Sequence, residues 1–216
     1  MKEIEISPSI ISSDLGHLAD QVNECERAGA ASFHLDIMDG HFVDNITMGP
    51  DLISAIRRNT KARLDGHLMI ERPDKYYMSF VKAGCDVLLI HYEAPLEIDS
   101  FLKKLNDEGI RYGIVINPDT DLPKIYKFLD SSEILLIMSV YPGFSGQKFL
   151  PGALEKIKKA HEYIINNGYK TRIEIDGGIN DETGKKAVEA GADILVSASY
   201  IFNGNIAERI DKLKNL

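Results

Sequence analysis

The segment from His34 to Phe42 places an imidazole and a carboxylate two residues apart, His34 and Asp36, in a stretch that is typical of a buried strand. Residues i and i+2 of a strand point to the same face, so these two side chains should project together. Burying an ionisable pair is unfavourable unless a metal, a partner charge or a catalytic role compensates for the lost hydration. Taken alone, the segment slightly favours a hydrogen-bonded structural pair in the core.

Groups of the same kind occur at the ends of two further predicted strands, where His67 and Asp176 stand. Together with His34 and Asp36 they form a set of two imidazoles and two carboxylates, which suits zinc, manganese, iron or cobalt. A satisfied core histidine is the alternative for His67, and a loop cap is the alternative for Asp176. The ligand types alone do not choose among these metals. We expect one divalent metal ion per subunit and favour zinc, with iron, manganese or cobalt as alternatives. His91 also ends a predicted strand, but it carries less weight as a functional residue.

Three turns are candidates for binding phosphate: 141–147 and 176–180, which contain glycine, and 197–199, which does not. Backbone N–H groups in tight turns and at helix starts bind anions, and barrel enzymes commonly use the loops after strands seven and eight. Any one of them could be merely a tight turn. Three at the same rim, beside carboxylates, predict a phosphorylated substrate.

Three methionines, Met38, Met69 and Met138, fall at or just past the ends of predicted strands. A single methionine in this place would be interpreted as core filling. Three of them around two carboxylates suggest an apolar pocket that keeps water from a reactive carbanion.

The elements that must position these groups are short apolar runs, each followed by a longer amphipathic segment. Eight strands alternating with helices predict a single-domain (β/α)8 TIM barrel over residues 1–216, with an open doubly wound sheet as the alternative. No GxGxxG motif follows the first strand, so a dinucleotide-binding version has no support. Glycines mark five predicted helix ends, at Gly29, Gly84, Gly109, Gly168 and Gly191. The predicted strands are Ile4–Ile11, Ser32–Asp36, Arg63–Met69, Val87–His91, Arg111–Ile116, Ile134–Met138, Thr171–Asp176 and Ile194–Val196.

Composition limits the class of protein. The chain has 216 residues, of which 44% are hydrophobic and 27% are charged, as expected of an ordinary globular protein. A net charge of -8 argues against nucleic acid or an anionic membrane as a partner. The two cysteines, Cys25 and Cys85, indicate no disulfide framework. The N-terminus lacks the apolar core of a signal peptide, and we expect a cytoplasmic enzyme or binding protein.

Six motifs give the chain a resemblance to ribulose-phosphate 3-epimerases, and they cover essentially its full length in order. They are SPSIISSD (Ser7–Asp14), HLDIMDGHFVDNITMGP (His34–Pro50), GHLMIERP (Gly66–Pro73), NPDT (Asn117–Thr120), MSVYPGFSGQKF (Met138–Phe149) and EIDGGIN (Glu174–Asn180).

The resemblance implies inversion of C3 of a ketose phosphate, D-ribulose 5-phosphate to D-xylulose 5-phosphate, a step of the pentose phosphate pathway. It implies that Asp36 and Asp176 are the acid and base and also bind the metal with His34 and His67. Such epimerases are often dimers or hexamers, so a homo-oligomer is expected. The residues expected to contact substrate are Ser9, His67, Met38, Met69, Met138, Gly143, Phe144, Ser145, Gly146, Gly177, Gly178, Ala198 and Ser199.

Four positions depart from the family pattern, namely Asp44, Tyr141, Ser145 and Ala198, and they leave the preferred sugar open. An epimerase of another ketose phosphate, such as D-allulose 6-phosphate, is the alternative. A sugar-phosphate lyase is less favoured, because related lyases carry a lysine in an Asp-x-Lys-x-x-Asp pattern where this chain continues from Asp65 without one. A non-catalytic sensor is less favoured still, since it would not need both aspartates.

Overall fold

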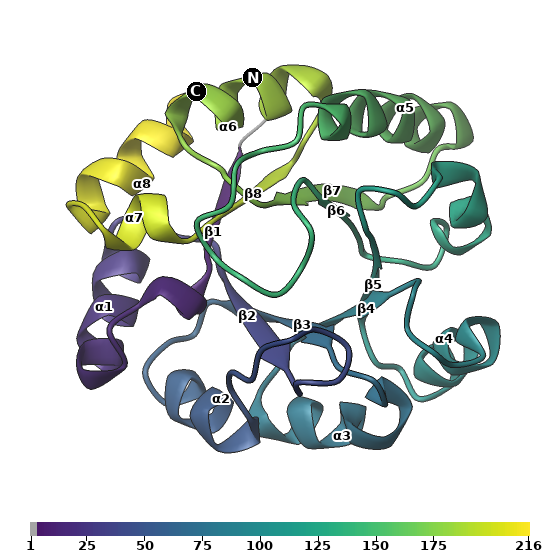
Figure 1. Ribbon diagram of the computed structural model, residues 1–216, viewed down its shortest axis with the longest axis horizontal. Coiled ribbons are helices and arrows are strands. Elements are labelled where there is room, and N and C mark those ends of the chain that lie inside the picture. Colours follow the sequence, from purple (N-terminus) through teal and green to yellow (C-terminus); the bar gives the residue numbers. More distant parts are fainter. Residues whose placement is uncertain (1–3) are drawn as a thin grey trace.

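The computed structural model describes residues 4–216 and has eight parallel strands curved into a barrel, with helices around the outside (Figure 1). Neighbouring strands pair in the order β1-β8-β7-β6-β5-β4-β3-β2, and a parallel bridge from Ser9 to His34 joins β1 to β2. The predicted single-domain (β/α)8 barrel is confirmed. The strands are β1 (Glu5–Pro8), β2 (Ser32–Met38), β3 (Arg63–Met69), β4 (Val87–His91), β5 (Tyr112–Ile116), β6 (Ile134–Met138), β7 (Arg172–Asp176) and β8 (Ile194–Ser197).

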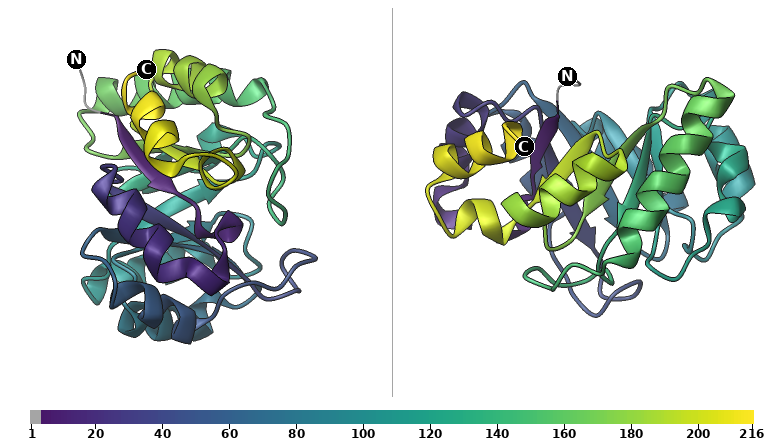
Figure 2. Two further views of the ribbon diagram at one scale, coloured as in Figure 1. Left: turned by 90° about the vertical axis from the view of Figure 1, so that its left-hand side faces the viewer. Right: turned by 90° about the horizontal axis from the view of Figure 1, so that it is seen from above.

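The helices follow the strands around the barrel, and the views in Figure 2 show their ribbons running alongside it. No α-helix follows β5; two 3₁₀ turns, Leu122–Lys124 and Tyr126–Phe128, take that place. Within residues 4–216, the helices are too short or too polar to cross a membrane. The helices are α1 (Leu18–Arg27), α2 (Pro50–Arg57), α3 (Pro73–Ala83), α4 (Ile98–Asp107), α5 (Gly152–Asn167), α6 (Asp181–Ala190), α7 (Ser199–Phe202) and α8 (Ile206–Lys214).

The first strand is shorter than predicted, because a polar side chain ends it. β1 stops at Pro8, and the Ser9 hydroxyl then accepts a hydrogen bond from the backbone N–H of Ile11, which starts a 3₁₀ turn. The predicted strand to Ile11 is therefore wrong at its end. The turn leaves Ser9 at the mouth of the barrel, beside β2.

Alternate residues of each strand face the barrel axis, and the interior they fill has two unlike sides. What we call the apolar half is a buried cluster from β4, β5, β6 and β8, and it consists of Val87, Leu89, Val115, Ile134, Leu136, Met138, Val140 and Ile194. What we call the polar half is built by the polar inward residues of β1, β2, β3 and β7, together with Ser9 just after β1. Its members are Glu5, Ser7, Ser9, Ser32, His34, Asp36, Arg63, Asp65, His67, Arg172, Glu174 and Asp176.

Charged groups at the N-terminal end of the polar half compensate one another. The Arg63 guanidinium donates to Asp65 at 2.8 Å and to Glu5 at 3.1 Å, and Arg172 also pairs with Glu5. Ion pairs inside a protein are tolerated when each charge has such partners. This end of the barrel is a structural network. The residues predicted from the sequence as metal ligands lie at the other end.

Candidate active site and metal centre

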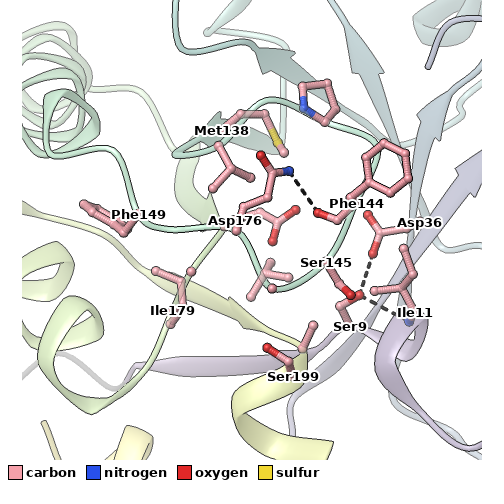
Figure 3. A pocket seen from close by; sticks show the side chains of 18 of the residues that line it. Ser9, Ile11, Asp36, Met138, Phe144, Ser145, Phe149, Asp176, Ile179 and Ser199 are labelled. Carbon is pink, nitrogen blue, oxygen red and sulfur yellow. Dashed lines mark hydrogen bonds between the residues drawn. The ribbon is translucent and has the colours of Figure 1, made fainter. Parts of the chain in front are cut away.

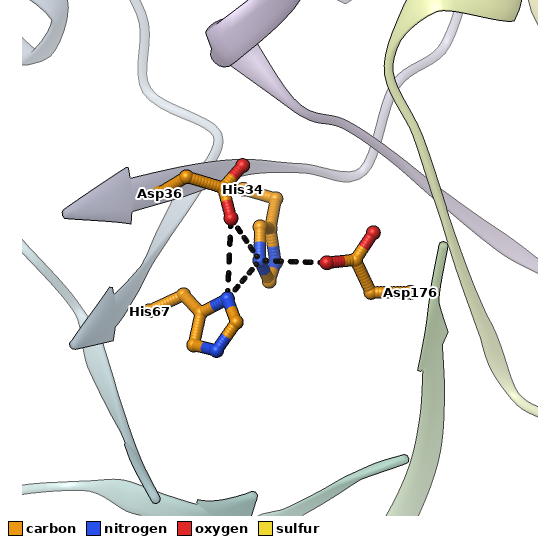
Figure 4. Close-up of side chains that lie close together, drawn as sticks. All are labelled: His34, Asp36, His67 and Asp176. Carbon is orange, nitrogen blue, oxygen red and sulfur yellow. Dashed lines mark hydrogen bonds and ion pairs between the residues drawn. The ribbon is translucent and has the colours of Figure 1, made fainter. Parts of the chain in front are cut away.

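Four side chains predicted as metal ligands converge at the C-terminal end of the polar half. His34 and Asp36 come from β2, His67 from β3 and Asp176 from β7, and Figure 4 shows them pointing toward one another. One nitrogen or oxygen atom from each lies within 4.8 Å of all the others. Strand pairing explains part of this, because Asp36 is directly opposite His67 in the β2–β3 register.

The distances between these atoms fit a small divalent cation. His34 Nε2 lies 3.0 Å from His67 Nδ1 and 3.8 Å from Asp176 Oδ2, and His67 Nδ1 lies 3.2 Å from Asp36 Oδ1. Ligand atoms held at about 2.1 Å around a tetrahedral ion are roughly 3.4 Å apart. Two imidazole nitrogens and two carboxylate oxygens also form a suitable donor set for zinc and its neighbours. The residues present therefore fit a divalent metal ion.

A buried carboxylate holds the outer nitrogen of His34. His34 Nδ1 is 2.9 Å from Glu174 Oε1, and both side chains are completely buried. Burial alone would lower the pKa of His34, but the charges of Asp36 and Asp176 and the hydrogen bonds to Asp36 and Glu174 raise it well above its usual value. Three carboxylates around one buried ring favour a cation between the four side chains.

The second imidazole has a different environment. Burial lowers the pKa of His67 to about 3, so the ring is neutral, as a metal ligand must be. Its outer nitrogen, Nε2, lies 2.8 Å from Nε2 of His91, which ends β4 and is fully buried. His91, which carried little weight as a functional residue in the sequence, thus contacts a predicted ligand directly.

The two aspartates are held differently. Asp36 Oδ2 accepts a 2.5 Å hydrogen bond from the Ser9 hydroxyl, and Asp36 Oδ1 faces the two imidazoles. Burial opposes ionisation of Asp36, but His34 and His67 hold its pKa below the usual range. Burial, with the charges of Asp36 and Glu174, raises the pKa of Asp176 to about 7. The two carboxyl groups are thus pushed toward opposite protonation states.

A cavity of about 540 Å³ lies over the cluster, within the range of small-molecule sites. Ser9 reaches it from just after β1, Asp36 from β2 and Asp176 from β7, and Figure 3 shows these side chains projecting into the same pocket. His67, predicted to contact substrate, is fully buried beneath it and is not in its lining. The other predicted contact residues all line the cavity: Met38, Met69, Met138, Gly143, Phe144, Ser145, Gly146, Gly177, Gly178, Ala198 and Ser199.

The turn after β7 requires glycine. Gly178 has φ 60°, and a Cβ at this position would lie 2.6 Å from the backbone nitrogen of Phe149. Gly177 has φ 117°, and its carbonyl accepts a 2.6 Å hydrogen bond from the Ser139 hydroxyl. Ala198, one of the departures from the family pattern, has φ −107°, which is outside the left-handed region, so the position does not require glycine.

Two loops meet over the mouth of the cavity. The Asn45 amide donates a 2.7 Å hydrogen bond to the carbonyl of Gly143, which joins the loop after β2 to the loop after β6. Asp44 beside it is exposed and does not line the cavity. Tyr141 also lies outside the lining, and its hydroxyl donates to Asp119 at 2.6 Å. Of the four departures, Ser145 and Ala198 alone are in the lining.

Sequence reasoning missed several residues of the site. Glu174 stands two residues before Asp176 in β7, but its contact with His34 spans 140 residues and no local pattern reveals it. Asn180 and Thr183 line the cavity and also form the capping box of α6, so a helix-start signal marked them. Gln147, the last residue of the predicted turn 141–147, and Lys148, which directly follows that turn, line the cavity as well.

Comparisons with known proteins agree with the geometry. Residues 5–202 match the model of the ribulose-phosphate 3 epimerase family. Ribulose-phosphate 3-epimerase of Bacillus subtilis is 42% identical over 200 residues, which is 92% of each chain. The protein of the same name from Synechocystis is 41% identical over 217 residues, or 99% of this chain and 94% of that protein. A mutant tryptophan synthase α-subunit from Pyrococcus furiosus has a TM-score of 0.70 over 99% of this chain and 98% of that one, at 12% identity, and shares the fold alone.

Proposed function

The chain belongs to the ribulose-phosphate 3-epimerase family and is an isomerase, and from that premise we propose that Asp36 and Asp176 perform the two proton transfers at C3 of D-ribulose 5-phosphate. The observation that carries the proposal is the arrival of these two carboxylates in one cavity from β2 and β7. Inversion at a carbon needs a proton acceptor on one face and a donor on the other.

The proton transfers balance without an external acid or base. One carboxylate removes the C3 proton and becomes a carboxylic acid, which leaves an enediolate. The other, initially protonated, delivers its proton to the opposite face of C3 and becomes a carboxylate. The pair is then set for the reverse reaction, which explains why two groups of the same chemical type are suitable for a reversible epimerisation.

His34, Asp36, His67 and Asp176 would hold the divalent metal ion, whose identity we propose to be zinc from the two imidazoles in the set. When bound, the ion would supply Lewis-acid stabilisation of the negative charge that develops on the substrate oxygens. Ser9 supports Asp36 through its 2.5 Å hydrogen bond and limits the rotation of that carboxylate.

The remaining lining residues have roles in binding and shielding. We propose that backbone groups of Gly143–Gly146, Gly177–Gly178 and Ala198–Ser199 bind the phosphate. Met38, Met69 and Met138 line the cavity beside the two carboxylates. Their thioethers would exclude water from the enediolate and prevent its unproductive protonation.

The choice of sugar rests on the relatives. Those compared above are named ribulose-phosphate 3-epimerases, and the match extends across the whole barrel. This favours D-ribulose 5-phosphate over D-allulose 6-phosphate. A lyase is disfavoured because His67, a predicted metal ligand, stands on β3 where the lyase pattern has lysine. We further propose a homo-oligomer in the cytoplasm, supported by the family assignment.

A coupled assay tests this function directly. We expect conversion of D-ribulose 5-phosphate to D-xylulose 5-phosphate with a higher kcat/KM than for D-allulose 6-phosphate. Exhaustive chelation should abolish the activity, and added Zn²⁺ should restore it. Full activity in a protein verified to be metal-free would contradict the metal proposal, and a preference for the allulose compound would contradict the choice of sugar.

A further inference from the structure

A line of hydrogen-bonding side chains extends from the metal centre into the far side of the barrel. His67 Nε2 is 2.8 Å from His91 Nε2, and His91 Nδ1 is 3.1 Å from Oε2 of Glu93. The His67 and His91 ring centroids are 5.0 Å apart and their planes differ by 20°. The two nitrogens therefore lie on facing edges of nearly coplanar rings, which is the orientation of an in-plane N–H···N hydrogen bond.

The carboxylate at the end of this line is firmly anchored. Glu93 Oε1 accepts a 2.9 Å hydrogen bond from the backbone N–H of Asn117 and another from the Thr120 hydroxyl. Burial opposes its ionisation, but these donors and His91 hold the pKa of Glu93 below its usual value. The loop they belong to is itself fixed by the Lys156 ammonium, which donates to the carbonyls of Asn117, Pro118 and Thr120 at 2.6 to 3.0 Å.

An ionised carboxylate accepts hydrogen bonds and cannot donate them, so it sets the direction of the whole line. In the neutral form of His91, Glu93 requires the proton on Nδ1, which leaves His91 Nε2 as an acceptor. His67 must then carry its proton on Nε2, and its Nδ1, the atom directed at His34 and Asp36, keeps a free lone pair. Neutral imidazole in this tautomer is the form that binds a metal through Nδ1.

We propose that His91 and Glu93 are positioning residues that hold the tautomer and the ring orientation of His67 for a divalent cation. The inference rests on the proposed metal-binding role of His67. It gives a function to His91, a fully buried polar group at the end of a strand whose other inward residues, Val87 and Leu89, are apolar. Partners of this kind typically change metal affinity by about 10–100-fold when they are altered.

The substitution E93Q tests the direction of donation in the hydrogen bonds from His67 through His91 to residue 93, with almost no change in side-chain shape. The Asn117 N–H can only donate, so the glutamine oxygen should stay on it and the amide NH₂ should face His91 Nδ1. That reverses both hydrogen bonds and moves the His67 proton to Nδ1. We expect the dissociation constant for Zn²⁺, measured by competition with a chromophoric chelator, to rise about 10–100-fold. The ¹⁵N chemical shifts of His67 in the metal-free protein should change from the Nε2–H to the Nδ1–H pattern.

The matched control is E133Q. Glu133 lies on the loop between β5 and β6 and forms an exposed ion pair with Arg111, so the substitution removes the same charge away from the site. Its affinity for Zn²⁺ should equal that of the unmodified protein. If E93Q does not fold, H91Q and H91L replace it, since glutamine can accept from His67 and donate to Glu93 whereas leucine can do neither. We then expect H91L to bind Zn²⁺ more weakly than H91Q.

Three outcomes contradict particular statements. Equal Zn²⁺ affinity in E93Q and E133Q, with His67 still protonated on Nε2, would overturn the positioning role. Equal affinity in H91Q and H91L would do the same. Failure of the unmodified protein to bind Zn²⁺ would instead contradict the proposed zinc site, so the two proposals fail in different measurements.

Discussion

Both halves of the barrel interior are built from parallel strands, but their inward side chains are polar in one half and apolar in the other. In the polar half, the inward residues of β1, β2, β3 and β7 are held by hydrogen bonds and ion pairs, as Asp36 is by Ser9 and His34 by Glu174. In the apolar half, Leu89, Leu136 and Ile134 are completely buried within one hydrophobic cluster. The difference indicates that one side of the barrel carries the chemistry and the other supplies a rigid wall.

His91 and Met138 lie where the two halves meet, and each differs from the other inward residues of its strand. Met138 belongs to the apolar cluster but also lines the cavity, directly opposite Asp176 in the β6–β7 register. His91 ends β4, whose other inward residues are apolar, and contacts His67 of the polar half. The boundary is therefore where the apolar wall touches the reacting groups, and substitutions on its two sides should have different consequences.

The largest effect is expected from Asp36→Asn in the polar half. The amide can still accept from Ser9 but cannot take a proton from carbon, so kcat/KM should fall by at least about 10²–10⁴-fold. The free energy of unfolding of the metal-free protein should change little, because the side chain keeps its shape. Asp119→Asn is the control, since this carboxylate lies at the same rim but outside the cavity. An active Asp36→Asn variant would remove the functional distinction between the halves.

Leu136→Ala in the apolar half should have the opposite profile. Leu136 is completely buried, and its truncation should lower the free energy of unfolding by about 2–5 kcal/mol, measured by urea denaturation. The activity of the molecules that remain folded should fall far less than in Asp36→Asn. Leu136→Met, which nearly conserves volume, should lower the free energy of unfolding by less than about 1.5 kcal/mol. Loss of activity without loss of stability in Leu136→Ala would contradict the role of this half as a wall.

Much of this architecture could be predicted because it depends on local rules. The period of two residues along a strand places His34 and Asp36 on one face, and the barrel then brings His67 and Asp176 to the same rim. The five glycines predicted at helix ends, Gly29, Gly84, Gly109, Gly168 and Gly191, all have positive φ. The left-handed residue at a helix end is determined by the few residues around it, so it can be predicted without information on distant parts of the chain.

What could not be predicted depends on partners far apart in the chain. The Glu174–His34 and His91–His67 contacts join residues 140 and 24 positions apart, and each residue alone has an ordinary structural interpretation. The absence of an α-helix after β5 within the described residues was also not expected, since the general alternation predicts one. Strand parity reveals which residues face inward, but the partner of each depends on the closed geometry of the barrel.

The central claim, that two carboxylates serve the two faces of C3, is tested most directly by Asp176→Asn with D-ribulose 5-phosphate in D₂O. We predict that the folded variant produces no D-xylulose 5-phosphate, and that exchange of the C3 proton with solvent is abolished on the face that Asp176 serves. NMR would follow deuterium at C3 in each epimer supplied separately, with the unmodified enzyme exchanging both. Undiminished epimerisation by Asp176→Asn would contradict the two-carboxylate mechanism.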